Sequence, residues 1–265
     1  MHESRHAATP PASLAPVAKL AGLVRSPDFL DGLGEVLAAY FPGISYAAFH
    51  FSAQGRPTIL AHNLDATRHQ RVLIPYVERM YLLDPIFQHW ERHRARGVWS
   101  LDELAPAGFR DSDYFATYYR ELGLHDEAGA FFPLTEHDCL SLSFGFYRPL
   151  ATPAPDDVLA VLTYLFPLLE SLIGQFWLAS SLHLPSIDDQ APSQLHDFGR
   201  DVLSDRERDV AWLILRGYSS PEIARQLGIT QGTVKNHRKR LYSRLNISSQ
   251  GELFRQFMLF QQPHS

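Results

Sequence analysis

The stretch "ITQGTVKNHRKRLYSRLNIS", residues 229 to 248, decides how the carboxyl-terminal part of the chain folds. It holds five Lys or Arg residues and no Asp or Glu, although the whole chain of 265 residues has a formal net charge of -5. Its apolar residues Val234, Leu241 and Leu245 fall at spacings of seven and four, which puts them on one side of a helix. Thr230 is suited to cap that helix. The basic side chains must then point outward.

Two shorter helices are predicted before the basic one. A capping box of Ser204 and Glu207 starts the first of them. Ser220, followed by a proline, opens the second, and Gly228 supplies the left-handed turn after it. The amide groups at the start of the second helix are expected to offer a phosphate site. Three helices in this order, with a steep turn before the basic one, are typical of a helix-turn-helix.

This segment resembles the LuxR-type DNA-binding domain. The family pattern of an "LSxRE" start, "EIAxxLxIxxxTVKxH" and a closing Leu is met between Leu203 and Leu245. Arg238 stands where the family usually has an apolar residue, and its alkyl stem could cover the core while its charge reaches a phosphate. The alternative is a three-helix bundle whose basic surface has no partner. The resemblance implies a regulator that binds duplex DNA, as a homodimer on a palindromic operator, with RNA polymerase as a further candidate partner.

The basic helix is expected to enter the major groove and contact DNA through its outward residues. The resemblance implies that the base contacts are Lys235, Asn236 and Lys239. The expected phosphate contacts or helix supports are Thr233, His237, Arg238, Arg240 and Arg244. The last apolar segment, "GELFRQFMLF" at 251 to 260, commonly forms part of a dimer contact in this family, or else it only covers the bundle.

Charged residues are distributed unevenly along the chain, which indicates two parts with different functions. Residues 197 to 265 hold 11 Lys or Arg against 7 Asp or Glu, and the rest of the chain holds 13 against 22. The single cysteine and the amino terminus without an apolar signal segment predict a cytoplasmic protein. The apolar run at 158 to 179 is interrupted by polar residues and a proline, so a buried helix is expected and not a membrane span. The expected division is a flexible tail at 1–13, a ligand-sensor domain at 14–183, a linker at 184–200 and the helix-turn-helix domain at 201–265.

The front part is predicted to be an α+β sensor, an α/β/α sandwich with an antiparallel sheet. Helices are expected at 14–25, 28–40, 66–82, 86–95, 111–122 and 155–182, the second of them capped by Ser26. Strands are expected at 44–52, 57–63, 127–134 and 139–147. The pair Asp84-Pro85 and a tryptophan fifteen residues after that Asp, together with "ELGL", "FPL" and "LSLSF", resemble the autoinducer-type ligand sensor.

The resemblance implies a small-molecule effector in the front part. The candidate ligand-binding residues are Tyr46, Tyr76, Tyr81, Asp84, Trp99 and Ser141. Leu64 and Arg68 stand where the family has a tyrosine and a tryptophan, which disfavours an acyl-homoserine lactone. Asp84 has two readings of equal weight: it caps the next helix, or it binds a ligand through an amide N–H or an amine.

The sequence supplies no catalytic motif and no cofactor motif. In "HWERH" (89–93) the Glu is not beside the first His, as a zinc-protease helix requires, so no metal site is predicted. We also find no glycine-rich phosphate loop and no "GxSxG". Two alternatives stay open beside the ligand sensor: a protein-interaction module on the same DNA-binding domain, and an enzyme with a DNA-binding tail that would use a pair such as His50 and Asp84.

Overall fold

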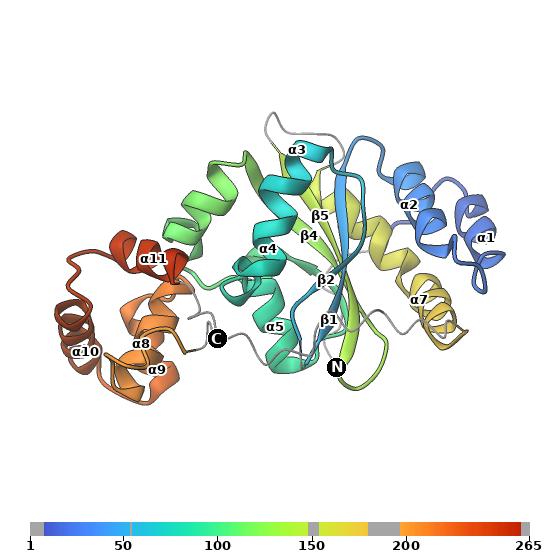
Figure 1. Ribbon diagram of the computed structural model, residues 1–265. Helices are drawn as coiled ribbons and strands as arrows, with labels where there is room; N and C mark the ends of the chain where they lie inside the picture. Colours follow the sequence, from blue (N-terminus) through green and yellow to red (C-terminus); the bar gives the residue numbers. More distant parts are fainter. Residues whose placement is uncertain (1–7, 54, 148–153, 180–196, 261–265) are drawn as a thin grey trace, which may run out of the picture.

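The computed structural model describes residues 8–53, 55–147, 154–179 and 197–260 (Figure 1). The predicted flexible tail and the predicted linker therefore lie mostly outside the described residues. The rest forms a layered sheet structure and a separate bundle of helices at one end of the molecule (Figure 1).

A five-stranded antiparallel sheet in the order β2-β1-β5-β4-β3 forms the centre of the layered part. The strands are β1 (Ser45–Ser52), β2 (Thr58–His62), β3 (Gly97–Ser100), β4 (Leu124–Pro133) and β5 (Asp138–Tyr147). Both predicted hairpins are present. The edge strand β3 was not predicted, because a run of four residues is too short to show a period of two.

One face of the sheet is covered by α1 (Ala15–Ala21), α2 (Phe29–Tyr40) and α7 (Pro155–Ala179) (Figure 1). Among the described residues, α7 is the one helix with the length and hydropathy of a membrane span, but its apolar side packs against the sheet. The predicted cap of α2 is wrong. The residue at the N-cap position is Asp28, and the Ser26 hydroxyl accepts a hydrogen bond from the Asp28 N–H before the helix begins.

The other face carries shorter helical segments. They are α3 (Ala66–Arg68), the π-helix η1 (His69–Leu73), α4 (Ile74–Glu78), the 3-10 helix η2 (Met80–Leu82), α5 (Pro85–His93), α6 (Leu101–Leu104), the 3-10 helix η3 (Phe109–Asp111) and the π-helix η4 (Phe115–Arg120). The single helix predicted at 66–82 is thus broken into four segments. Pro75 has no N–H to continue an α-helical ladder, and the wider π turn precedes it. The layers together are the predicted α/β/α sandwich.

The carboxyl-terminal bundle consists of α8 (Asp205–Leu215), α9 (Ser220–Leu227), α10 (Gln231–Arg244) and α11 (Gln250–Leu259). The capping box of Ser204, the left-handed Gly228 with φ of 64° and the Thr230 cap are confirmed. The start of α9 is shifted by one residue. Ser219 is its N-cap, because the matching Glu222 stands three residues later, and Ser220 is the first helical residue.

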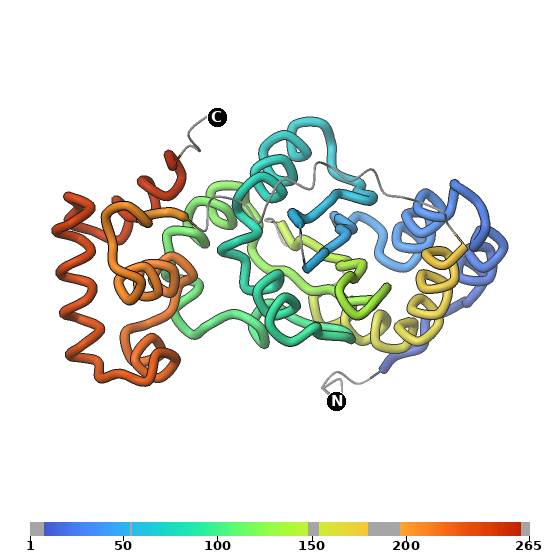
Figure 2. Tube along the Cα trace, turned by 60° about the horizontal axis from the view of Figure 1, so that its bottom comes forward, coloured from blue at the N-terminus to red at the C-terminus, as the bar shows by residue number. Residues whose placement is uncertain are grey.

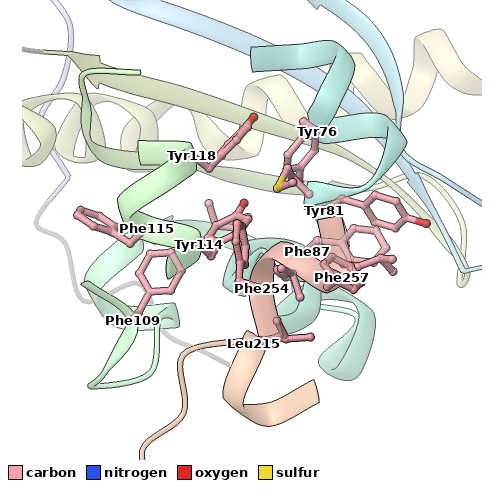
Figure 3. Close-up of a cluster of buried hydrophobic side chains, with 14 of the residues drawn as sticks. Tyr76, Tyr81, Phe87, Phe109, Tyr114, Phe115, Tyr118, Leu215, Phe254 and Phe257 are labelled. Atoms are coloured by element: carbon pink, nitrogen blue, oxygen red, sulfur yellow. The ribbon is translucent and has the colours of Figure 1, made fainter. Parts of the chain in front are cut away.

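The bundle packs against the sandwich through α11 and the turn after α8. Arg79 donates to the carbonyls of Phe257, at 3.3 Å, and Met258, and the Arg216 Nε lies 3.4 Å from the Leu82 carbonyl. Aromatic residues of the sandwich and apolar residues of the bundle form one continuous buried cluster (Figure 3). By contrast, α10 is the element farthest from the sheet (Figure 2).

Candidate DNA-binding surface and ligand pocket

The helix α10 carries exposed basic side chains and lies at the end of the molecule remote from the sheet (Figure 2). Val234 and Leu241 are fully buried and attach the helix to the bundle. The exposed predicted contacts are Lys235, Asn236, Lys239, Arg240 and Arg244. The half-buried ones are Thr233, His237 and Arg238. Helical spacing therefore separates the predicted residues into two groups. We call the five exposed residues the outward set and the three half-buried residues the flank.

Two residues of the flank have partners within the bundle. The Thr233 N–H donates to the Thr230 hydroxyl at 3.1 Å, so Thr233 belongs to the cap of α10. The Arg238 Nε donates to the Tyr242 hydroxyl at 3.1 Å, and its guanidinium lies over that ring. The half-buried Arg238 stem thus occupies the position where the family usually has an apolar side chain.

Arg244 connects α10 to α8. Its Nη1 lies 3.1 Å from Oε2 of Glu207 and donates to the Val202 carbonyl at 3.2 Å. Burial acts to raise the pKa of Glu207, but hydrogen bonds from Ser204 and the Arg244 charge outweigh it and leave that pKa below its usual range. Glu207 is only 2% exposed, so Arg244 supplies a charge that a buried carboxylate needs. Of the two roles expected for Arg244, phosphate contact or helix support, these contacts favour the support of the helix.

The start of α9 carries a carboxylate. Glu222 accepts hydrogen bonds from the N–H and hydroxyl of Ser219, at 2.8 Å and 2.6 Å, and one from the Ala107 N–H of the sandwich at 3.4 Å. Because this carboxylate already sits at the positive end of the helix, the site is unfavourable for a phosphate. The phosphate site expected there is not supported.

A cavity of about 40 Å³ lies between the sheet and the helical segments of the second face. It has room for only a few water molecules. Three predicted residues on the helices and on β5 line it: Tyr76, Asp84 and Ser141. The lining residues that the sequence analysis did not select include Glu127, Tyr114, Tyr118, Ser143 and Tyr147.

Asp84 has a structural role and also faces the cavity. Its Oδ1 accepts the Ile86 N–H at 3.0 Å and its Oδ2 accepts the Phe87 N–H at 3.3 Å, which caps α5. The Tyr76 hydroxyl donates to the same Oδ2 at 2.7 Å. Burial raises the pKa of Asp84 to about 6 in spite of these donors. The two readings of Asp84 are therefore compatible with one position.

Three other predicted ligand residues are placed differently. Tyr46 borders the cavity, but its ring belongs to the buried cluster on the opposite face of the sheet. There its hydroxyl packs so closely on Gly34 that a Cβ at that position would lie 2.4 Å from it. Trp99 packs on Phe131 and over Gly129, outside the lining. Tyr81 contacts Phe87 near the bundle (Figure 3). Successive strand residues alternate between faces, which separates Tyr46 from the lining side chains of β1.

Glu127 is the most informative lining residue that the sequence analysis missed. It lies on β4, where it accepts a hydrogen bond from the Ser143 hydroxyl at 2.8 Å and another from the Tyr119 hydroxyl. Burial, and then the nearby Asp84 charge, raise the pKa of Glu127 to about 8. The alternation that puts Phe131 on this face also puts Glu127 there, so the strand pattern contained the signal.

The pair that an enzyme was expected to use is not assembled. His50 stacks on Trp177 of α7, with ring centroids 5.1 Å apart, and its Nε2 lies 3.5 Å from an Asp138 oxygen. Asp84 lies on the other side of the sheet, in the cavity. Among the residues the structure describes, no group of three or more His, Cys, Asp or Glu side chains is arranged to hold a metal ion.

The fold and the basic surface together define a two-part transcription regulator. The family model of bacterial regulatory proteins of the luxR family, GerE, matches residues 201–257. A putative HTH-type transcriptional regulator in the exeN 3' region of Aeromonas salmonicida is 37% identical over 184 residues, which cover 66% of this chain and 93% of that protein. The chain belongs to the LuxR family of bacterial regulatory proteins. It is a transcriptional regulator with a LuxR-type DNA-binding domain.

Two further relatives each resemble one part of the chain. The transcriptional regulatory protein MctR of Rhizobium johnstonii is 47% identical over 57 residues, which are 22% of this chain and 27% of that protein. The solved structure of the VqsR LBD domain from Pseudomonas aeruginosa covers 63% of this chain and 95% of that chain, with a TM-score of 0.51 and 23% identity. The second likeness supports the fold of the sandwich.

Proposed function

We propose that the chain reads a specific operator in duplex DNA with α10 and that a small molecule in the sandwich cavity controls this binding. The observation that carries the DNA part is the outward set, whose side chains are exposed on α10, at the end of the molecule remote from the sheet (Figure 2). Lysine suits the acceptors of guanine and asparagine suits adenine, so Lys235, Asn236 and Lys239 are assigned to bases. Arg240 is assigned to a phosphate.

The control by a ligand is supported by the continuity between cavity and bundle. Tyr76, Tyr114 and Tyr118 line the cavity and belong to the same buried cluster as Phe254 and Phe257 of α11 (Figure 3). A ligand that changes the packing of these tyrosines changes the surface on which the DNA-binding bundle rests. The protein acts in the cytoplasm as a homodimer on a palindromic site, where RNA polymerase is a candidate partner.

The proposal is tested by DNA binding of the full chain carrying single substitutions on α10. We expect Lys235→Ala to weaken binding to the preferred site, selected from random duplexes, by about 1 to 3 kcal/mol and to relax base preference at one position. Arg240→Ala should weaken binding to all sequences alike and flatten the salt dependence by about one unit of slope.

Arg71→Ala is the matched control, because Arg71 is an exposed arginine on the sandwich. It should leave both affinity and salt slope unchanged. Losses that are equal and independent of sequence for Lys235→Ala and Arg240→Ala would contradict the assignment of base contacts. No affinity of the wild-type chain for any duplex at low salt would contradict the DNA-binding proposal itself.

A further inference from the structure

The cavity contains two carboxyl groups and lacks a basic partner for them. Asp84 comes from the start of α5 and Glu127 from β4, and both line the same space. Within the described residues, the lining includes no Lys, Arg or His. Arg68 reaches two lining residues, Ser45 at 3.5 Å and the ring of Tyr147, but it is not itself part of the lining. The cavity is therefore acidic without internal compensation.

Two hydroxyl groups of the lining have no hydrogen-bond partner in the described part of the chain. They are the Ser141 Oγ and the Tyr114 hydroxyl, each on a residue that is 1% exposed. In the close-up, the Tyr114 hydroxyl points toward the space between Tyr76 and Tyr118 (Figure 3). Buried hydroxyls without partners are costly, so a polar group that enters the cavity gains hydrogen bonds there.

The remaining lining is apolar and limits the ligand's size. It includes Phe49, Phe51, Val72 and Leu73. A ligand must match an acidic pole, two free hydroxyls and an apolar wall in a small volume. An anion would meet the negative charge of Asp84, and a plain hydrocarbon would leave the acidic and hydroxyl groups without partners.

We propose that the cavity binds a small organic amine, whose ammonium group meets Asp84 and Glu127 and whose short apolar part packs against the phenylalanines of β1. The inference rests on the proposed function, in which the cavity is a ligand site. An ammonium group is a donor of three hydrogen bonds and has no acceptor, which fits carboxylates and the free hydroxyls. Charge-assisted bonds of this kind are the stronger ones.

The protonation of Glu127 gives this proposal a distinctive readout. The titratable groups that face Glu127 are Asp84, its neighbour Asp126 and four phenols, and burial keeps the phenols neutral by raising the pKa of each: Tyr114, Tyr118, Tyr119 and Tyr147. With a pKa of about 8, Glu127 is mainly protonated at pH 7 when the cavity holds no cation. An ammonium ion favours the carboxylate, so its binding should release up to about one proton.

The test uses the full-length chain and three four-carbon probes of similar size: n-butylamine, n-butanol and butyrate. We expect n-butylamine to raise the melting temperature at pH 7 and the other two probes to have little effect. Calorimetry in buffers of different ionisation enthalpy should show proton release with the amine. Glu127→Gln should weaken amine affinity about ten- to a hundredfold and abolish the release, and Glu121→Gln, an exposed residue nearby, should change neither.

The outcomes separate this inference from the proposed function. Stabilisation by n-butanol or butyrate, equal to or greater than that by the amine, would overturn the amine class and retain the cavity as a ligand site. Stabilisation by the amine without proton release, unchanged in Glu127→Gln, would also overturn it. If none of the probes stabilises the chain up to its solubility limit, both the amine class and ligand control lose their support.

Discussion

Asp84 shows how one carboxyl group combines two duties. It accepts two backbone N–H groups at the start of α5 and the hydroxyl of Tyr76, and it also faces the cavity. Either role, the helix cap or the ligand contact, would be enough to account for an aspartate at this position before Pro85. The hydrogen bonds of the cap fix the position of the carboxyl group at the edge of the cavity, where its charge can contact a ligand.

We predict that Asp84→Ala destabilises the unliganded protein by about 1 to 3 kcal/mol, because α5 loses its cap and Tyr76 loses its buried acceptor. Asp84→Asn should stay within about 1 kcal/mol of the wild type, since Asn caps helices about as well as Asp. Urea unfolding of each variant provides the measurement. Asp65→Ala, which removes the exposed cap of α3, is the control and should cost less.

The same experiment has a pH dependence with a defined sign. The folded-state pKa of Asp84 is raised to about 6, so its contribution to stability is present at low pH and is lost as pH rises through that value. Asp84→Asn should therefore gain stability relative to the wild type as pH rises from about 4, near the pKa of an unperturbed Asp, to about 6, with no further gain above about pH 7. A constant difference across this range would show that the carboxyl group is not buried as described.

At the scale of elements, α7 has an apolar stripe that the sandwich does not cover. Tyr164, Leu168 and Leu178 are exposed on it, and Leu178 is 84% exposed. Their spacing of four and ten residues places them along one side of the helix. Gly174, between them, has open space where a side chain would be. Such a stripe is suited to a second copy of the same helix in a two-fold dimer.

We predict that Leu168→Glu prevents formation of the proposed dimer, because it places a charge in the centre of this stripe. Analytical ultracentrifugation with and without operator DNA measures the change. Val202→Glu is a matched control, because Val202 is similarly exposed but lies on the bundle. A dimer that persists in Leu168→Glu at the same concentration would exclude α7 as the contact.

The sequence predicted those elements best whose signals are local. The caps and the left-handed glycine of the bundle depend on residues three or four apart, so Ser204, Gly228 and Thr230 were assigned correctly. The DNA-binding surface follows from the period of α10 for the same reason. The cavity is harder, because Glu127 and Tyr114 meet Asp84 only through strand pairing and packing. Tyr46 borders the cavity as predicted, but its ring lies on the opposite face, because successive strand residues alternate between faces.

At the scale of the whole molecule, hydrogen bonds between the sandwich and the bundle involve α9, α11 and the turn after α8, whereas α10, the proposed DNA-reading helix, lies farthest from the sheet (Figure 2). Arg79 of the sandwich donates to two carbonyls of α11, and Gly108 approaches Gly217 so closely that a Cβ on Gly108 would lie 2.7 Å from the Gly217 carbonyl. In this arrangement α11 is covered by the sandwich. The alternative in which α11 joins a second bundle therefore requires that this contact first separates.

We predict that Arg79→Ala loosens the bundle from the sandwich while each keeps its own core. Loss of charged hydrogen bonds to these part-buried carbonyls costs about 1.5 to 3 kcal/mol, or roughly a ten- to hundredfold shift toward separated parts. Small-angle X-ray scattering should show a larger radius of gyration than for the wild type. Arg71→Ala is again the control, and identical scattering of Arg79→Ala and wild type would contradict the prediction.

The shared aromatic cluster also limits how freely the two parts can be exchanged with those of other regulators. If the bundle were fused to a foreign sensor, Leu215 and Phe254 would lose the aromatic surface of Phe109 and Tyr114 and would become exposed (Figure 3). Such a hybrid would tend to aggregate or lose its response. A functional hybrid needs the segment from Phe109 to Arg120 to be transplanted together with the bundle, so the unit of recombination is larger than the DNA-binding domain.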